Sequence, residues 1–292
     1  MYANLDAAGG GELAGLEMIH YSGGEGRVEG APPVLFVHGA FAGAWCWEVH
    51  YLPYFAGIGY VAHALSLRGH GGSDGRERLG TASLRDYVED LATAVAALDQ
   101  PPVLIGHSMG GLVVDLAVRQ GVPAAGVILL AAVPPTGLAP SGIQMMLTEP
   151  RLLWQMGVLQ GFGPGWVDVE AARRALFAEE MDAESLLEYT SRMQPESQLA
   201  LFEMSFPRWP RWGGVGCPVA VIGAEADAII PPWMVQVTAW FHGVQPRWIP
   251  DAGHAMMLEP GWQRGAEVVA GALTGMAAAP AVRTRADGWS VR

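Results

Sequence analysis

The chain has 292 residues, of which 51% are hydrophobic and 16% charged, and its formal net charge is −12. This composition excludes a disordered chain, and the length fits about two ordinary domains or one large domain with an insertion. All basic residues are arginine and form no basic stripe, so no nucleic-acid partner or anionic membrane surface is predicted.

The beginning of the chain does not resemble a targeting segment. The first basic residue is Arg27, and acidic residues precede it, which does not fit a signal peptide. No apolar run reaches the ~18 residues of a membrane-spanning helix. Cys46 and Cys217 are too few for a disulfide framework and are predicted to be buried free thiols. We therefore predict a cytoplasmic protein without a membrane span, in which the Gly- and Ala-rich residues 1–15 form a loose lead-in.

Six short apolar runs are predicted to be β-strands. Most are continuous rather than alternating, which is typical of parallel strands covered on both faces. The runs lie at residues 34–37, 61–67, 103–105, 127–130, 219–222 and 247–249.

Helical patterns separate these strands. Ser83 and Asp86 form a capping box before an apolar helical face that continues to Leu98. Residues 110–120 and 260–275 also have helical periodicity. This alternation predicts an α/β fold with a doubly wound, mostly parallel sheet.

One connection is far longer than the usual ~2–6 residues. Residues 134–214 separate two predicted strands and contain helical patterns at 169–180 and 182–193, together with many large apolar side chains. We therefore predict a core of residues 1–133 and 215–292, and a mainly helical lid, or cap, of residues 134–214.

A motif for a nucleophilic serine follows the third predicted strand. Gly106-His107-Ser108-Met109-Gly110 has the form G-x-S-x-G and opens a helix. Small residues at the glycine positions allow the strand and helix to approach closely around a sharp turn. The context therefore predicts Ser108 as the nucleophile.

The base and its orienting acid are expected at the ends of later strands. His254 follows the sixth predicted strand and is the candidate base. Asp227 follows the fifth and is the candidate acid, with Glu225 as the alternative and Asp251 as a weaker one.

An oxyanion requires two N–H donors. The N–H of Met109, next to the nucleophile, is the first candidate. Ala40, in the loop after the first predicted strand, is the second, with Phe41 as the alternative. We interpret His38 as a residue that braces this loop.

Taken together, these motifs resemble the α/β-hydrolase superfamily over nearly the whole chain. The resemblance implies the α/β-hydrolase fold and ester hydrolysis through an acyl-enzyme, with no cofactor or metal. Ser66 departs from the family, which often has Asp at that position. The segment around Trp45-Cys46-Trp47 is also similar to plant methylesterases and their hydroxynitrile-lyase relatives. The matching pieces are His38-Gly39-Ala40-Phe41, Arg68-Gly69-His70-Gly71-Gly72-Ser73, Gly106-His107-Ser108-Met109-Gly110-Gly111, Asp227 and Gly253-His254.

The predicted substrate is a small or medium apolar ester, and the oligomeric state is left open. Lactonases, thioesterases and C–C hydrolases use the same triad and remain alternatives, and a hydrolase-fold ligand receptor is the alternative from another class. A hydroxynitrile lyase is disfavoured because the plant enzymes need a lysine, which this chain lacks. Phe41, Met145, Met146 and Trp154 are predicted to contact the substrate. The histidine spacing matches no zinc motif, so no metal is predicted.

Overall fold

The computed structural model describes residues 5–23, 28, 30–148, 150–207 and 215–277. Its centre is an eight-stranded sheet with the strand order β1-β2-β4-β3-β5-β6-β7-β8. Strands β3 to β8 pair in parallel, whereas the β1–β2 and β2–β4 pairs are antiparallel. The mostly parallel sheet is therefore confirmed. The strands are β1 (Leu5–Leu13), β2 (Leu16–Gly23), β3 (Val34–Val37), β4 (Val61–Leu65), β5 (Val103–His107), β6 (Gly126–Leu130), β7 (Val219–Ala224) and β8 (Arg247–Ile249).

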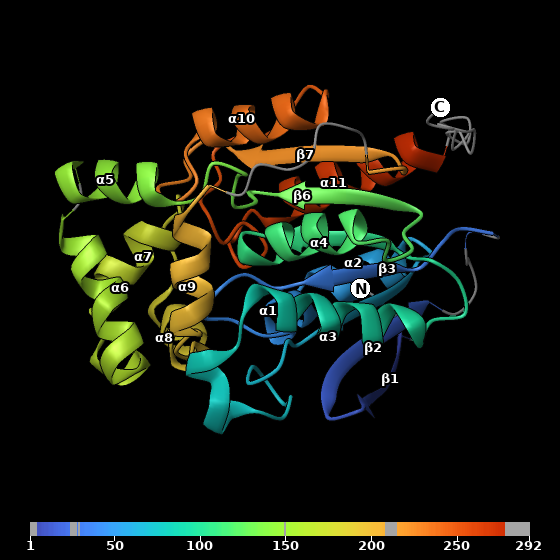
Figure 1. Cartoon of the computed structure of the whole chain (residues 1–292), viewed down its shortest axis with the longest axis horizontal. Helices are drawn as coiled ribbons and strands as arrows, with labels where there is room; N and C mark the ends of the chain where they lie inside the picture. Colours follow the sequence, from blue (N-terminus) through green and yellow to red (C-terminus); the bar gives the residue numbers. More distant parts are fainter. Residues whose placement is uncertain (1–4, 24–27, 29, 149, 208–214, 278–292) are drawn as a thin grey trace, which may run out of the picture.

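Helices cover both faces of the sheet, as in a doubly wound fold (Figure 1). One face packs against α1 (Trp45–Glu48), α2 (Tyr51–Gly57) and α11 (Trp262–Ala277), and the other against α3 (Leu84–Ala96), α4 (Met109–Arg119) and α10 (Pro232–His242). The 3-10 turn η1 (Arg76–Thr81) precedes α3. None of the described helices is long and apolar enough to cross a membrane.

A further group of helices gathers at one end of the sheet, on the left in Figure 1. All of them belong to the long connection between β6 and β7, of which residues 208–214 lie outside the described part. They are α5 (Ala139–Thr148), α6 (Pro150–Phe162), η2 (Pro164–Trp166), α7 (Val169–Leu176), α8 (Ala183–Arg192) and α9 (Gln198–Ser205). Helix α7 ends four residues before the predicted end at residue 180.

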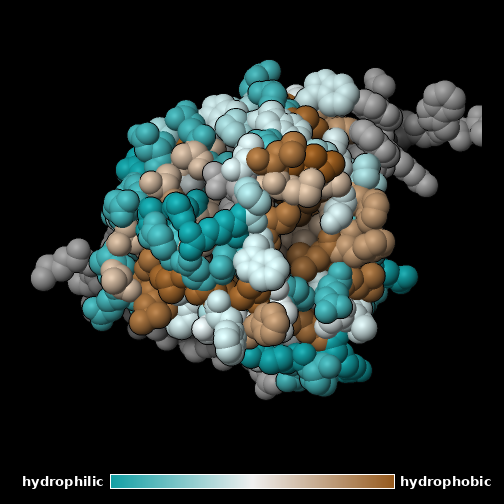
Figure 2. Space-filling view, turned by 90° about the vertical axis from the view of Figure 1, so that its left-hand side faces the viewer, coloured by the Kyte–Doolittle hydropathy of each residue, from teal (hydrophilic) through white to brown (hydrophobic). Residues whose placement is uncertain are grey.

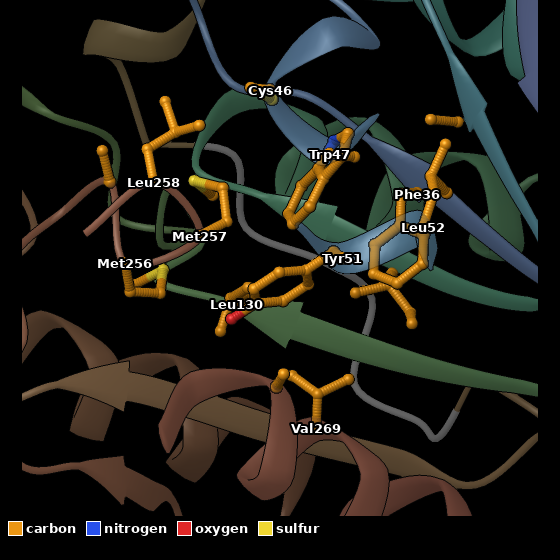
Figure 3. Close-up of a cluster of buried hydrophobic side chains, with 14 of the residues drawn as sticks. Phe36, Cys46, Trp47, Tyr51, Leu52, Leu130, Met256, Met257, Leu258 and Val269 are labelled. Atoms are coloured by element: carbon orange, nitrogen blue, oxygen red, sulfur yellow. The ribbon is translucent and has the colours of Figure 1, made fainter. Parts of the chain in front are cut away.

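Strand β3 shows why the apolar runs are continuous. Val34 and Phe36 enter the core on one face of the sheet, whereas Leu35 and Val37 enter the core on the other. Phe36 packs against Trp47 with ring centroids 4.8 Å apart, in the cluster drawn in Figure 3. Both faces therefore exclude water, and every residue of the strand is buried.

The prediction of a loose lead-in is wrong for residues 5–13, which form β1. Strands β1 and β2 form a hairpin in which Leu13 pairs with Leu16. Its two turn residues, Ala14 and Gly15, have φ values of 50° and 81°, the positive values that tight hairpin turns require. The Gly- and Ala-rich composition gave no alternating apolar signal that could reveal this strand.

The structure also tests the predictions for the capping box and for the two cysteines. Ser83 and Asp86 form the predicted capping box at the start of α3. Cys46 is a buried free thiol, but Cys217 is only half-buried. Residues 277–292 have no helical periodicity and are predicted to lie on the surface, but those beyond residue 277 lie outside the described part of the chain.

Candidate active site

Ser108 occupies the sharp turn between β5 and α4. Its backbone has φ 52° and ψ −117°, a left-handed conformation that costs a non-glycine residue about 1–3 kcal/mol. Hydrogen bonds hold the turn on both sides. The Ser108 N–H donates to the Leu130 carbonyl at 3.1 Å, and the Val133 N–H donates to the Ser108 carbonyl at 3.0 Å. The neighbouring strand thus keeps the serine at the carboxyl end of β5.

Two glycines allow this turn because backbone atoms occupy the space that a Cβ would need. A Cβ at Gly106 would lie 2.4 Å from the Gly110 carbonyl oxygen. A Cβ at Gly110 would lie 2.4 Å from the carbonyl oxygen of His38 and 2.5 Å from that of Val37. The start of α4 therefore packs directly against the end of β3 and brings the following loop next to Ser108.

This close approach predicts a loss of stability in the Gly110→Ala variant. We expect its free energy of unfolding to fall by about 1–3 kcal/mol, because the added methyl group must push β3 and α4 apart. Gly142→Ala is the control: a Cβ there meets open space, and alanine in a helix is expected to add about 0.5–1 kcal/mol. Denaturant titration measures both, and a Gly110→Ala protein as stable as wild type would contradict the packing described.

Asp227 and His254 meet at the ends of β7 and β8. Nδ1–H of His254 donates to Oδ2 of Asp227 at 2.7 Å, and both side chains are buried. Oδ1 of Asp227 accepts the N–H groups of Ile229 and Ile230, each at 2.8 Å. With its Nδ1 proton bound to Asp227, the His254 ring presents Nε2 as the proton acceptor.

The alternative acids do not share this geometry. Glu225 and Asp251 are both exposed, and neither donates to or accepts from His254 in the described part of the chain. Ser108 and His254 line the same pocket. The Ser108 hydroxyl has no hydrogen-bond partner among the described residues.

Two residues that sequence reasoning did not single out hold the His254 loop in place. Nε2–H of His107 donates to the His254 carbonyl at 2.9 Å. Burial lowers the pKa of His107 well below its ordinary value, so its ring is neutral. Oε1 of Glu259 accepts the N–H of Gly253 at 3.0 Å and that of Ala178 at 2.5 Å. His107 lies inside the serine motif, which was a usable signal, whereas no local pattern marks Glu259.

Unpaired N–H groups surround the serine turn. Within the described residues, the N–H groups of Ala40, Phe41 and Met109 have no acceptor. Met109 is the first residue of α4, where the helix dipole favours negative charge. Ala40 lines the same pocket as Ser108, and Phe41 turns the loop with φ 66°.

His38 braces this loop from behind. Its Nδ1–H donates to the Gly39 carbonyl at 2.8 Å, and its Nε2 accepts the Leu67 N–H at 3.1 Å. Burial, with a smaller contribution from His70, lowers the pKa of His38 to about 3. The ring is therefore neutral and fully occupied by the backbone.

The pocket at Ser108, here called the main pocket, has a cavity volume of about 70 Å³. Among the described residues, no Asp, Glu, Lys or Arg lines it. No group of three His, Cys, Asp or Glu in the described residues is placed to hold a metal ion. The walls of the main pocket include Ala40, Cys46, Tyr189, Met257 and Leu258, beside Ser108 and His254.

The four predicted substrate contacts lie elsewhere. Phe41 and Met145 are buried, and Phe41 lines a second pocket that adjoins the main pocket. Met146 and Trp154 are 54% and 71% exposed and line an outer groove between α5 and α6. The structure therefore brings none of the four into the main pocket. The large side chains that do line it from the inserted segment include Leu176, Phe177, Tyr189 and Met193.

Comparison with known sequences identifies the family of this chain. The sequence model described as "Alpha/beta hydrolase family" matches residues 34–270, which include every candidate site residue. The chain belongs to the alpha/beta hydrolase family.

Plant esterases are similar to this hydrolase-family chain in sequence, and solved structures are similar to it in fold. Esterase PIR7B of Oryza sativa subsp. japonica is 38% identical over 35% of this chain and 40% of its own length. Methylesterase 2 of Arabidopsis thaliana is 35% identical over 30% of this chain and 33% of its own length. The chain thus spans less than half the length of the curated relatives it matches. An esterase from Thermogutta terrifontis has a TM-score of 0.69 at 23% identity, covering 89% of this chain and 94% of its own, which shows the shared fold.

In this hydrolase-family chain, the inserted segment is anchored to the loops of the site. The Gln194 N–H donates to the Phe41 carbonyl at 3.0 Å, and the Gln194 side chain bonds to Gly69 and Gly71. Glu196 is almost fully buried and accepts from His70 at 3.0 Å and from Tyr87 at 2.6 Å. The segment of the insertion between α8 and α9 is therefore tied to the core.

The buried carboxylate of Glu196 makes a pH-dependent contribution to stability. Burial alone would raise its pKa, but His70 and Tyr87 outweigh burial and hold the pKa below the ordinary value. Because the folded-state pKa is depressed, this stabilisation is present above the unfolded pKa and is lost as the pH falls through the folded pKa.

We expect Glu196→Gln to lower the free energy of unfolding by about 3 kcal/mol at pH 7, because it breaks a buried charged network. The difference from wild type should shrink toward pH 3. Denaturant titrations across this range measure it, with the exposed Glu184→Gln as control. A difference independent of pH would contradict an ionised Glu196.

Proposed function

We propose that this chain is a serine-dependent carboxylic-ester hydrolase. The observation that carries the proposal is the buried Asp227–His254 hydrogen bond at 2.7 Å, beside a strained serine in the same pocket. A histidine held in one tautomer by a carboxylate can act as a general base toward a hydroxyl. The names of the esterase relatives support the same reaction class.

In the proposed acylation step, Nε2 of His254 takes the proton of the Ser108 hydroxyl. Oγ of Ser108 then attacks the carbonyl carbon of the ester, and the negative charge develops on the carbonyl oxygen. The N–H groups of Ala40 and Met109 would bind this oxygen, and Phe41 offers an alternative donor. His254 returns the proton to the leaving alcohol, and the acyl group stays on Ser108.

In the proposed deacylation step, water replaces the alcohol. His254 takes a proton from the water, whose oxygen attacks the acyl carbonyl. Collapse of the intermediate releases the carboxylic acid and returns the proton to Oγ of Ser108. Asp227 orients the ring of His254 and stabilises its charged form during both steps. The chain's own residues thus account for every proton.

The substrate proposed from the pocket is neutral and apolar. Aliphatic, aromatic and sulfur-containing side chains form most of the walls of the main pocket. A charged group there would lose its hydration without a charged partner, which costs several kcal/mol. An ester with hydrocarbon substituents therefore fits better than a charged one.

The inserted segment would act as a lid of residues 134–214 over the core of residues 1–133 and 215–292. It supplies Leu176, Tyr189 and Met193 to the pocket walls. Its outer face carries a hollow with mostly hydrophobic walls (Figure 2). The anchors at Gln194 and Glu196 would restrict any movement to the helices before them.

A panel of substrates tests the proposal. Purified protein is assayed on p-nitrophenyl esters of increasing acyl length, on lactones and on acyl thioesters. Turnover of esters above the other classes supports the proposal. Faster turnover of lactones or thioesters would assign the same machinery to those substrates. No turnover, with a Ser108 that still reacts with an organophosphate, would overturn hydrolysis in favour of a ligand receptor.

A further inference from the structure

We propose that a second pocket beside the main pocket binds one of two hydrocarbon groups of the substrate, so that the natural ester is apolar on both sides of the ester bond. This inference rests on the proposed ester hydrolysis. The second pocket, here called the Phe41 pocket, has a cavity volume of about 60 Å³. Its walls include Phe41, Met156, Leu159, Ala172, Ala175 and Ile229.

The Phe41 pocket adjoins the proposed catalytic groups. Phe41 follows Ala40 in the loop of the oxyanion donors. Ile229 donates its N–H to the carboxylate of Asp227 at 2.8 Å. Leu176 and Met193 belong to the walls of both pockets. The two pockets therefore share part of one wall, formed by Leu176 and Met193.

Neighbouring residues in the loop after β3 line different pockets. Gly39, Ala40 and Ala42 line the main pocket, whereas Phe41 lines the second. The carbonyl group of an ester bound to the N–H groups of this loop would lie between the pockets. Its two substituents leave the ester group in different directions, so one could enter the main pocket and the other the Phe41 pocket.

The chemistry of the Phe41 pocket favours hydrocarbon. Nine of its ten lining side chains are apolar, and the amide oxygen of the tenth, Gln155, already accepts the Asp168 N–H at 2.8 Å. Each methylene buried there contributes roughly a fourfold gain in affinity. An ester of methanol would leave one of the two pockets empty, and a charged substituent would find no partner.

Of the two residues in the shared wall, one is held in place and the other can change its conformation. Leu176 is held by its carbonyl, which accepts the N–H of Ala255 beside His254 at 2.8 Å. Met193 follows the end of α8, and only its backbone N–H is bound, to Thr190 at 3.3 Å. An unbranched thioether side chain changes rotamer at low cost. Met193 is therefore the residue that would move when a substrate occupies both pockets.

Filling and enlarging the pocket tests the proposal. Ala172→Phe places a ring in the Phe41 pocket, and Leu159→Ala enlarges it. Val158→Ala is the matched control, because Val158 is adjacent on α6 but lines the outer groove. The quantity to measure is kcat/KM on two series of esters. In the first, p-nitrophenyl esters carry acyl chains of increasing length, and in the second, acetate esters carry alcohol chains of increasing length. Circular dichroism and thermal melting establish that each variant is folded.

We expect Ala172→Phe to lower kcat/KM for the long-chain esters of one series at least tenfold more than for the shortest ester of that series. A tenfold loss corresponds to about two methylenes that are no longer buried. Leu159→Ala should move the optimum in that series toward longer chains, and Val158→Ala should move neither. The affected series tells whether the acid or the alcohol occupies the pocket. Equal effects of Ala172→Phe on short and long members of both series would overturn the proposal.

A binding measurement separates this inference from the proposed hydrolysis. Hexyl butyrate, which is apolar on both sides, is titrated calorimetrically into Ser108→Ala protein with and without Ala172→Phe. A roughly tenfold weaker Kd in the double variant supports the second pocket even if the wild type turns over no ester. An unchanged Kd overturns it, whatever the rate measurements show.

Discussion

Replacing Ser108 by alanine is expected to lower kcat for ester hydrolysis by roughly 10⁴- to 10⁶-fold. The substitution removes only Oγ, the atom that would attack the carbonyl carbon. Alanine has the same Cβ and must adopt the same left-handed backbone, so the turn should keep its conformation. Residual activity would come from binding and from the oxyanion donors alone. Steady-state rates on the preferred ester measure the effect.

The control for this substitution is structural. Circular dichroism and thermal melting of Ser108→Ala should match the wild type, because none of the hydrogen bonds found in the described chain uses the hydroxyl. Active-site labelling by an organophosphate should disappear. If folded Ser108→Ala protein hydrolysed the ester at the wild-type rate, another nucleophile would have to be responsible and the mechanism would be wrong.

Asp227→Asn is expected to lower kcat by about 10⁴-fold. The amide can donate where the carboxylate could only accept, so it no longer selects the His254 tautomer with a proton on Nδ1. It also removes the negative charge that would stabilise a protonated His254. Because Asp227 accepts two backbone N–H groups as well, some loss of stability should accompany the loss of rate.

Glu225→Gln is the matched control for Asp227→Asn. Glu225 is two residues earlier in the same loop and is exposed, with no hydrogen bond to His254. Its substitution should change kcat less than threefold, within the range of an exposed charge on the loop. A large effect of Glu225→Gln, with a small effect of Asp227→Asn, would reassign the orienting acid.

Local patterns were sufficient where the physical cause is local. Continuous apolar runs predicted β3 to β8 because a strand covered on both faces buries most of its side chains, and apolar side chains are buried at the least cost. The capping box predicted the start of α3 because its hydrogen bonds join residues three apart. The serine motif was equally readable, since the glycines that permit the turn lie within two residues of Ser108.

Patterns failed where a residue's neighbours come from distant segments. The strand β1 carries no apolar alternation and is paired through its hairpin with β2. Large apolar side chains in the insertion suggested a substrate pocket, but composition does not say which side of a helix faces inward. Met146 and Trp154 face outward, whereas Leu176 and Met193 line the pocket.

The sequence by itself determined strands β3 to β8, helices α3, α4 and α11 and the order of Ser108, Asp227 and His254, because burial and turn geometry act on neighbouring residues. Only the tertiary structure decided what surrounds them. Glu259 and Gln194 support the site through contacts with segments far away in the chain. The division between the main pocket and the Phe41 pocket depends on how α6 to α8 pack over the loop after β3, and side-chain packing between distant segments leaves no local signature.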